Sequence, residues 1–135
     1  MSERRRVGAL IIENKKLLLV NSADRSYYYT PGGKIESGES DLEALKRELQ
    51  EELSIDLVNA KPYLNYESQY SGNSDNEQIN KVYCFLVDYR GAISPQNEVE
   101  KIFWYSKDDF QKGYPEISQG MKNHLVPKLI EDKLL

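Results

Sequence analysis

The stretch GKIESGESDLEALKRELQEELSI, residues 33–55, contains the strongest structural signal in the chain. Ser40, with Glu43 three residues later, has the pattern of a capping box and predicts that a helix begins here. Four leucines then recur at the spacing of one helical face: Leu42, Leu45, Leu49 and Leu53. We therefore predict an amphipathic helix over 40–53 whose leucine face packs against a sheet.

Three glutamates, Glu48, Glu51 and Glu52, share one flank of this helix, about 110° around from the leucine face. Such a cluster is most often a solvated surface, because like charges at this spacing cost only a few tenths of a kcal/mol. It is also a suitable site for a hard divalent cation, since Mg²⁺ prefers carboxylate oxygens and keeps several water ligands. The helix alone leaves both interpretations open.

A tight turn precedes the helix, because Pro31-Gly32-Gly33 ends a short strand predicted over 27–30. Glycine lets the backbone bend sharply and approach a ligand closely, so main-chain groups of the turn can lie near the glutamates. Arg47 and Glu39 can form a bidentate ion pair that fixes the loop against the helix. The alternative for this pair is a surface contact of little energetic value.

The spacing of these residues resembles the Nudix box, in which a glycine, a glutamate and an Arg-Glu-aliphatic-any-Glu-Glu run stand at fixed intervals. Gly33, Glu39 and the run 47–52 occupy those positions. The match departs from the pattern at Ser54, where the box has glycine. Serine in the left-handed conformation would cost about 1–2 kcal/mol, so we expect the helix to end in another way.

The resemblance implies the Nudix fold, an α/β protein with a mixed β-sheet in an α/β/α sandwich, formed by residues 1–135 as a single domain. It implies a catalytic set made of Arg47 and the three glutamates. Glu51 and Glu52 correspond to the central ligands of Mg²⁺ or Mn²⁺. Glu48 corresponds to a further ligand or to the group that orients the attacking water.

The resemblance also implies support around this set. Gly33 and Glu39 would hold the loop, and the carbonyl of Gly32 is a candidate metal ligand. Many members of the family complete the site with an acidic residue outside the box. Our candidate is Glu98, shortly before the last predicted strand, and its rivals are Glu77 and Glu100.

The activity implied by the resemblance is hydrolysis of a phosphoanhydride bond in a nucleoside diphosphate linked to another moiety, such as a nucleoside triphosphate. Tyr29, before the glycine turn, is a weak candidate for contact with the substrate. One alternative is a nucleotide-binding module without catalysis, which the complete set of box carboxylates disfavours. Another is an isoprenoid-diphosphate isomerase, which needs a reactive cysteine, whereas Cys84 lies in an apolar run.

Composition restricts the remaining choices. The net charge is −4, which argues against a protein that grips duplex nucleic acid, because such domains carry a basic face. One cysteine and one histidine exclude a Cys-rich zinc site and make a Ser-His-Asp triad implausible. No apolar run is long enough for a membrane span, and the apolar run after the N-terminal arginines is too short for a signal peptide. We expect a cytoplasmic protein that binds a small nucleotide, with a homodimer as one oligomeric option.

Outside the box, apolar runs predict strands over 7–12, 17–20, 27–30, 63–70, 81–89 and 99–105. A spaced apolar pattern predicts a terminal helix over 117–129 with an interruption at Pro127. The polar segment 71–78 is either a plain hairpin connection or a cover for the substrate. The basic run Arg4-Arg5-Arg6 is interpreted as a solvated segment, with phosphate contact as the alternative.

Overall fold

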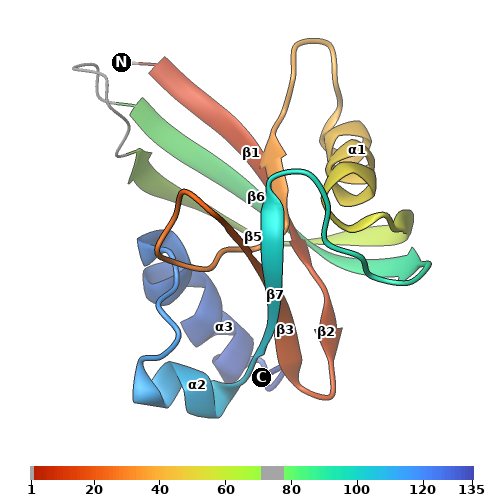
Figure 1. The fold of residues 1–135 in the computed structure, drawn as a ribbon. Coiled ribbons are helices and arrows are strands. Elements are labelled where there is room, and N and C mark those ends of the chain that lie inside the picture. The colour runs from red at the N-terminus through yellow and green to blue at the C-terminus, as the bar shows by residue number, and fades with distance from the viewer. Residues whose placement is uncertain (1, 71–77) are drawn as a thin grey trace.

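The computed structural model describes residues 2–70 and 78–135 and shows two β-sheets flanked by helices (Figure 1). The larger sheet has the strand order β4-β1-β6-β5. Strand β1 runs parallel to β6 and antiparallel to β4, so the sheet is mixed and the predicted fold class is confirmed. Its strands are β4 (Gly32–Lys34), β1 (Ser2–Leu10), β6 (Gln78–Arg90) and β5 (Asp56–Tyr70).

The smaller sheet has the strand order β2-β3-β7. Its members are β2 (Ile12–Glu13), β3 (Lys16–Ser22) and β7 (Val99–Tyr105). The strand predicted over 27–30 is reduced to two isolated bridges, Tyr29 with Val20 and Tyr28 with Ile117. The short helix α2 (Lys107–Lys112) follows β7.

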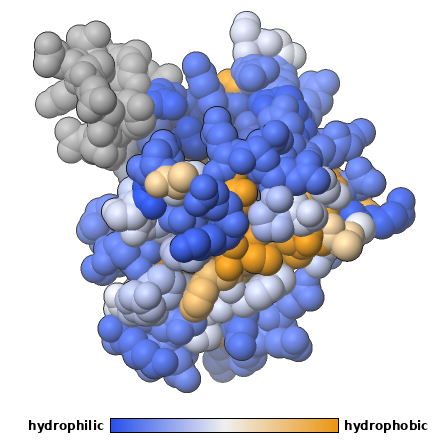
Figure 2. Space-filling view, viewed as in Figure 1, coloured by the Kyte–Doolittle hydropathy of each residue, from blue (hydrophilic) through white to orange (hydrophobic). Residues whose placement is uncertain are grey.

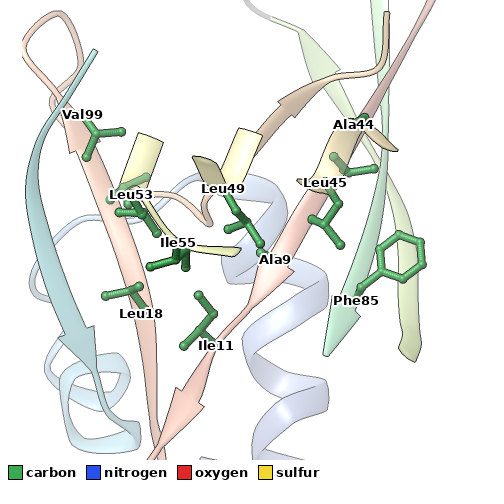
Figure 3. Packing of buried hydrophobic residues seen from close by; sticks show 12 residues of the cluster. Ala9, Ile11, Leu18, Ala44, Leu45, Leu49, Leu53, Ile55, Phe85 and Val99 are labelled. Carbon is green, nitrogen blue, oxygen red and sulfur yellow. The ribbon is translucent and has the colours of Figure 1, made fainter. Parts of the chain in front are cut away.

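Helix α1 (Asp41–Leu53) begins with the predicted capping box. The backbone N–H of Glu43 donates to Ser40 Oγ at 3.1 Å, and the N–H of Ser40 donates to Glu43 Oε1 at 2.9 Å. The buried face consists of Ala44, Leu45, Leu49 and Leu53, which pack on Ala9, Ile11 and Leu18 from the sheets (Figure 3). The prediction for Leu42 is wrong: its side chain is 49% exposed, because the apolar face runs through Ala44 in the first turn.

The end of α1 contradicts the expectation for Ser54. This serine adopts the left-handed conformation, with φ 57° and ψ 35°, and its backbone N–H donates to the carbonyl of Gln50 at 3.2 Å. The helix therefore ends as it would with glycine. The folded chain carries the steric strain that a side chain has in this conformation.

The other layer is the C-terminal helical segment, which packs on the opposite side of the larger sheet from α1. A π-helical segment over Met121–Leu125 leads into α3 (Val126–Glu131), so the predicted interruption falls at the start of α3. Pro127 lies in the first turn of α3, directly after the π-helical segment, so the residue without an N–H donor falls where the helical hydrogen-bond pattern changes. Figure 2 shows a largely hydrophilic face, with apolar side chains gathered in its middle beside β7. None of the helices in the described part of the chain is long and apolar enough to cross a membrane.

Candidate active site

The glycine turn and β4 bring the backbone against α1 at the edge of the larger sheet. Gly32 has a φ of +140°, and a Cβ placed there would lie 2.0 Å from the carbonyl oxygen of Val7. A Cβ on Gly33 would lie 2.6 Å from Oε1 of Glu48. Both positions therefore require glycine, the first for the β1–β4 pairing and the second for the place of the Glu48 carboxylate.

Glu52 is half-buried where α1 meets this edge. The backbone N–H of Gly32 donates to Glu52 Oε1 at 3.3 Å. Burial, together with the neighbouring carboxylate of Glu48, raises the pKa of Glu52 from its ordinary value of 4.5 to about 9. In the absence of a cation the raised pKa favours a proton on Glu52 at neutral pH, and a divalent ion at this edge would favour the charged carboxylate instead.

Arg47 organises the carboxylates on the outer side of the same helix. Its Nε and Nη2 donate to the two carboxylate oxygens of Glu39 at 2.6 and 3.0 Å, which is a bidentate pair. Its Nη1 donates to Glu48 Oε1 at 2.9 Å and to Glu51 Oε2 at 3.3 Å. Hydrogen bonds from Arg47 and from the backbone of Glu36 lower the pKa of Glu39 to about 2. The loop is thus fixed to the helix through one guanidinium.

The three box glutamates differ in exposure. The side chain of Glu48 is 14% exposed and that of Glu51 is 53% exposed. Among the side chains of residues 4–68 and 79–135, no three from Asp, Glu, His or Cys stand close enough together to hold a metal ion as they are. Arg47 Nη1 contacts one oxygen of Glu48 and one of Glu51. The donor set nevertheless suits a hard divalent cation, because Glu48 and Glu52 share one half-buried edge and the more exposed Glu51 lies on the same flank of α1.

The remaining candidate ligands are the carbonyl of Gly32 and the acidic residues Glu98, Glu100 and Glu77. Gly32 contacts the helix through its N–H, which donates to Glu52. Asn97 Nδ2 donates to the carbonyl of Glu51 at 2.6 Å, which docks the loop before β7 on the end of α1. Glu98, the next residue, is exposed, and so is Glu100. Glu77 lies outside the described residues.

Arg25, Tyr27 and Tyr29 form an aromatic and cationic group near Glu52. Tyr29 is half-buried, and its pKa is raised mainly by burial, with a further contribution from the charge of Glu52. The guanidinium carbon of Arg25 lies 5.3 Å from the centre of the Tyr29 ring and 5.8 Å from that of Tyr27. Sequence reasoning missed Arg25, because nothing in the loop over 23–26 marks it.

Arg6 is a second residue that sequence reasoning placed wrongly. The basic run is part of strand β1 and is not a solvated segment. Burial, and then the charges of Arg4 and Arg25, lower the pKa of Arg6, whereas Glu48 and Glu52 raise it. The alternation of strand residues is the signal that could have found it, since Val7 points into the core under α1 and its neighbour points the other way.

Comparisons with known proteins agree with this geometry. The model of the NUDIX domain family matches residues 2–125. The chain is 29% identical over 115 residues to the uncharacterized Nudix hydrolase YvcI of Bacillus subtilis, a match that spans 82% of this chain and 72% of that protein. It is 48% identical over 83 residues to the 8-oxo-dGTP diphosphatase of Haemophilus influenzae, which spans 62% of this chain and 57% of that protein.

Solved structures show the same fold. The solution structure of the E. coli ORF135 protein superposes with a TM-score of 0.73 at 27% identity, covering 91% of this chain and 86% of that one. The crystal structure of the MutT protein from Methanosarcina mazei Go1 superposes with a TM-score of 0.74 at 22% identity, covering 98% and 96%. The second likeness concerns the fold alone.

Proposed function

The chain belongs to the NUDIX family and is a Nudix-type pyrophosphohydrolase, and we propose that it cleaves a phosphoanhydride bond of a small nucleotide with the help of Mg²⁺ or Mn²⁺. The observation that carries the proposal is the half-buried pair of Glu48 and Glu52 beside the glycine turn. A carboxyl group whose pKa is raised in this way, as that of Glu52 is, can exchange its proton for a cation.

The metal ligands in this proposal are Glu48, Glu51 and Glu52, with the Gly32 carbonyl and Glu98 as further candidates. When bound, the divalent ion would supply the positive charge that attracts the phosphates and polarises the attacking water. The remaining steps belong to the chain itself. Glu52 gives up its proton to solvent when the cation binds.

Arg47 would hold Glu48 in the orientation that aligns water for attack on phosphorus. Its guanidinium is fixed by Glu39 and contacts Glu48 directly, so the position of that carboxylate depends on the loop. Water attacks one phosphorus and gives up a proton to solvent. The bond from that phosphorus to the bridging oxygen breaks, and the other fragment keeps that oxygen, so a nucleoside triphosphate yields a nucleoside monophosphate and pyrophosphate. Positioning and electrostatic stabilisation supply the rate without a covalent intermediate.

The alternative chemistry within the fold, isomerisation of an isoprenoid diphosphate, finds no support in Cys84. Its side chain is 1% exposed, and burial raises the pKa of the thiol to about 12. A thiol in this state is a packed apolar group and does not act as an acid or base near neutral pH.

A nucleoside triphosphate is the first substrate to test, because the relative from Haemophilus influenzae is an 8-oxo-dGTP diphosphatase. A triphosphate also suits a small domain with aromatic side chains beside the carboxylates. A homodimer and a cytoplasmic location stay predictions. A panel assay can distinguish ordinary triphosphates, oxidised triphosphates and sugar nucleotides as substrates.

The test is to assay a panel of nucleoside triphosphates and diphosphate derivatives with and without Mg²⁺, and to identify the products by mass. We expect release of a nucleoside monophosphate only with the metal, and a loss of at least about 100-fold in kcat for Glu51→Gln and for Glu52→Gln. Glu131→Gln changes an exposed glutamate on α3; it is the matched control and should keep full activity.

Turnover by a Glu51→Gln/Glu52→Gln double variant would refute the metal assignment. Binding without any turnover by the unmutated protein would favour the nucleotide-binding module.

A further inference from the structure

The last turn of α1 ends in carbonyl groups for which the helix has no further N–H donors. The carbonyl of Gln50 accepts from the N–H of Ser54 at 3.2 Å. The three carbonyls that follow it need donors from elsewhere, and the last turn contains no basic residue that could supply them. The loop over 91–98, between β6 and β7, provides these donors beside the end of α1 (Figure 1).

Each of the three carbonyls accepts one hydrogen bond from the loop over 91–98. Two of them belong to Glu51 and Glu52, whose side chains are metal ligands in the proposed function. The loop therefore holds the backbone from which these two side chains extend. The bonds run from Asn97 Nδ2 to the carbonyl oxygen of Glu51 at 2.6 Å, from the N–H of Gln96 to that of Glu52 at 2.9 Å, and from the N–H of Ser94 to that of Leu53 at 2.9 Å.

Both ends of this loop are fixed against the same part of the molecule. A Cβ placed on Gly91 would lie 3.6 Å from the carbonyl oxygen of Ser54, so the start of the loop packs against the residue that ends α1. At the other end, Val99 is buried in the same apolar cluster as Leu53 (Figure 3). The loop is thus a support for the last turn of α1, anchored on both sides of its three donors.

Asn97 supplies the donor that comes from a side chain. Its backbone has a φ of 57°, in the left-handed region that asparagine tolerates better than most residues. Glycine adopts that conformation more easily, so backbone geometry alone does not require asparagine here. The side chain is exposed, and an exposed hydrogen bond of this kind contributes little to the stability of the fold. What asparagine adds over glycine is an amide that fixes the backbone of Glu51.

Glu51 is the box glutamate whose position depends most on its backbone. Its side chain is 53% exposed, and its carboxylate lies 3.3 Å from Arg47 Nη1. The side chain of Glu48 is 14% exposed and lies closer to the same nitrogen, at 2.9 Å. A ligand that must be ordered when the cation binds lowers the affinity, because the loss of its freedom opposes binding. A fixed backbone at Glu51 reduces that loss.

We propose that Asn97 is a positioning residue for the metal-binding glutamates. By holding the carbonyl of Glu51, it fixes the last turn of α1 and thereby sets the affinity of the site for a divalent cation. The identity of the ligands rests on the proposed function, whereas the affinity for the cation can be measured without turnover.

The test measures the Kd for Mn²⁺ alone, from the electron paramagnetic resonance signal of the free ion, with the full chain and two variants. Asn97→Gly keeps the left-handed backbone and removes the amide, and Asn97→Ala removes the amide and keeps the strain. The matched control is Asn14→Gly, an exposed asparagine with a φ of 52° in the turn between β2 and β3. Thermal unfolding of each variant is recorded beside the Kd.

We expect the Kd for Mn²⁺ to rise about tenfold in both Asn97 variants and to stay unchanged in Asn14→Gly. The unfolding temperatures of Asn97→Gly and Asn14→Gly should each move by less than about 5 °C. With a nucleotide substrate, the Mg²⁺ concentration for half-maximal rate should rise about tenfold in Asn97→Gly, while kcat at saturating Mg²⁺ falls less than about threefold. Loss of stability alone would not give a defect that excess metal repairs. Should Asn97→Ala fail to fold, Asn97→Gly decides the question.

An unchanged Kd in Asn97→Gly, an equal loss in Asn14→Gly, or no binding of Mn²⁺ by the unmutated chain would overturn the positioning role. Failure of the proposed function gives a different result. If no nucleotide is hydrolysed while Asn97→Gly still weakens Mn²⁺ binding, the positioning role stands and the hydrolase assignment falls. If metal-dependent hydrolysis is present and Asn97→Gly binds Mn²⁺ as the unmutated chain does, the assignment stands and the positioning role falls.

Discussion

At the level of single residues, the site depends on the carboxyl group of Glu52, whose surroundings disfavour its charge. Glu52 has a pKa of about 9, because desolvation and the neighbouring Glu48 both disfavour its charge. The N–H of Gly32 and the charge of Arg6 act in the opposite direction but do not restore the ordinary value. The metal-free site is therefore more nearly neutral than a count of its glutamates indicates.

This raised pKa predicts how the stability of the metal-free chain depends on pH. Between the ordinary pKa of 4.5 and about 9, the folded chain holds a proton on Glu52 that the unfolded chain releases. The stabilising contribution of that proton is complete below pH 4.5 and is lost as the pH rises through 9. We expect Glu52→Gln, whose side chain stays neutral, to be more stable than the unmutated chain at pH 9, with a gap that shrinks toward pH 6.

Urea unfolding in EDTA at several values of pH between 6 and 9 measures this gap. Parallel stability curves for the two proteins would show that Glu52 ionises normally. The same series with Mg²⁺ present provides the control, since a bound cation should favour the charged carboxylate and reverse the trend.

The two glycines of the turn predict different phenotypes. Gly33→Ala places a methyl group 2.6 Å from Oε1 of Glu48, at the far end of a flexible side chain. We expect kcat to fall at least tenfold while the free energy of unfolding changes by less than about 1 kcal/mol. Gly32→Ala meets the backbone of Val7 at a φ of +140° and should cost about 3 kcal/mol or more. Activity assays and urea unfolding on both variants separate these roles, and equal stability of the two would contradict the geometry.

At the level of elements, α1 connects the core to the site, since one face carries leucines and the adjacent flank carries glutamates. Leu49 is fully buried, so Leu49→Ala should lower the free energy of unfolding by about 2–5 kcal/mol. The matched control is Leu42→Ala, whose side chain is 49% exposed and whose loss should cost less than about 1 kcal/mol. Chemical denaturation measures both, and similar costs would mean that the buried face of α1 is assigned wrongly.

The end of the same helix offers a gain in stability. Ser54 has a positive φ of 57°, a conformation that glycine adopts without steric cost. Ser54→Gly should therefore raise the free energy of unfolding by about 1 kcal/mol, since the relief of strain exceeds the added freedom of the unfolded chain. Measurement of the urea midpoint tests this, with Ser54→Ala as the control that keeps the strain. A destabilised Ser54→Gly would indicate that the serine side chain contributes a contact of its own.

At the level of the whole molecule, local patterns predicted the helix, its cap and three of its four leucines, together with the mixed α/β fold. The expected pair of Arg47 and Glu39 is also present. The errors share a cause, which is dependence on tertiary context. Leu42 could not be placed because spacing alone does not show which turn of a helix reaches the core. Arg6 could not be placed because its neighbours on the sheet, from β6 and from α1, are distant in sequence.

The central position of β1 governs how the molecule can be assembled during synthesis. One edge of β1 pairs with β4, which emerges from the ribosome soon after it, whereas the other edge pairs in parallel with β6, which is made much later. Arg6 and the glutamates of α1 are thus translated long before the strand that completes the sheet around them. Until β6 arrives, one edge of a basic strand is unpaired, and the nascent chain must keep that edge from associating with other chains.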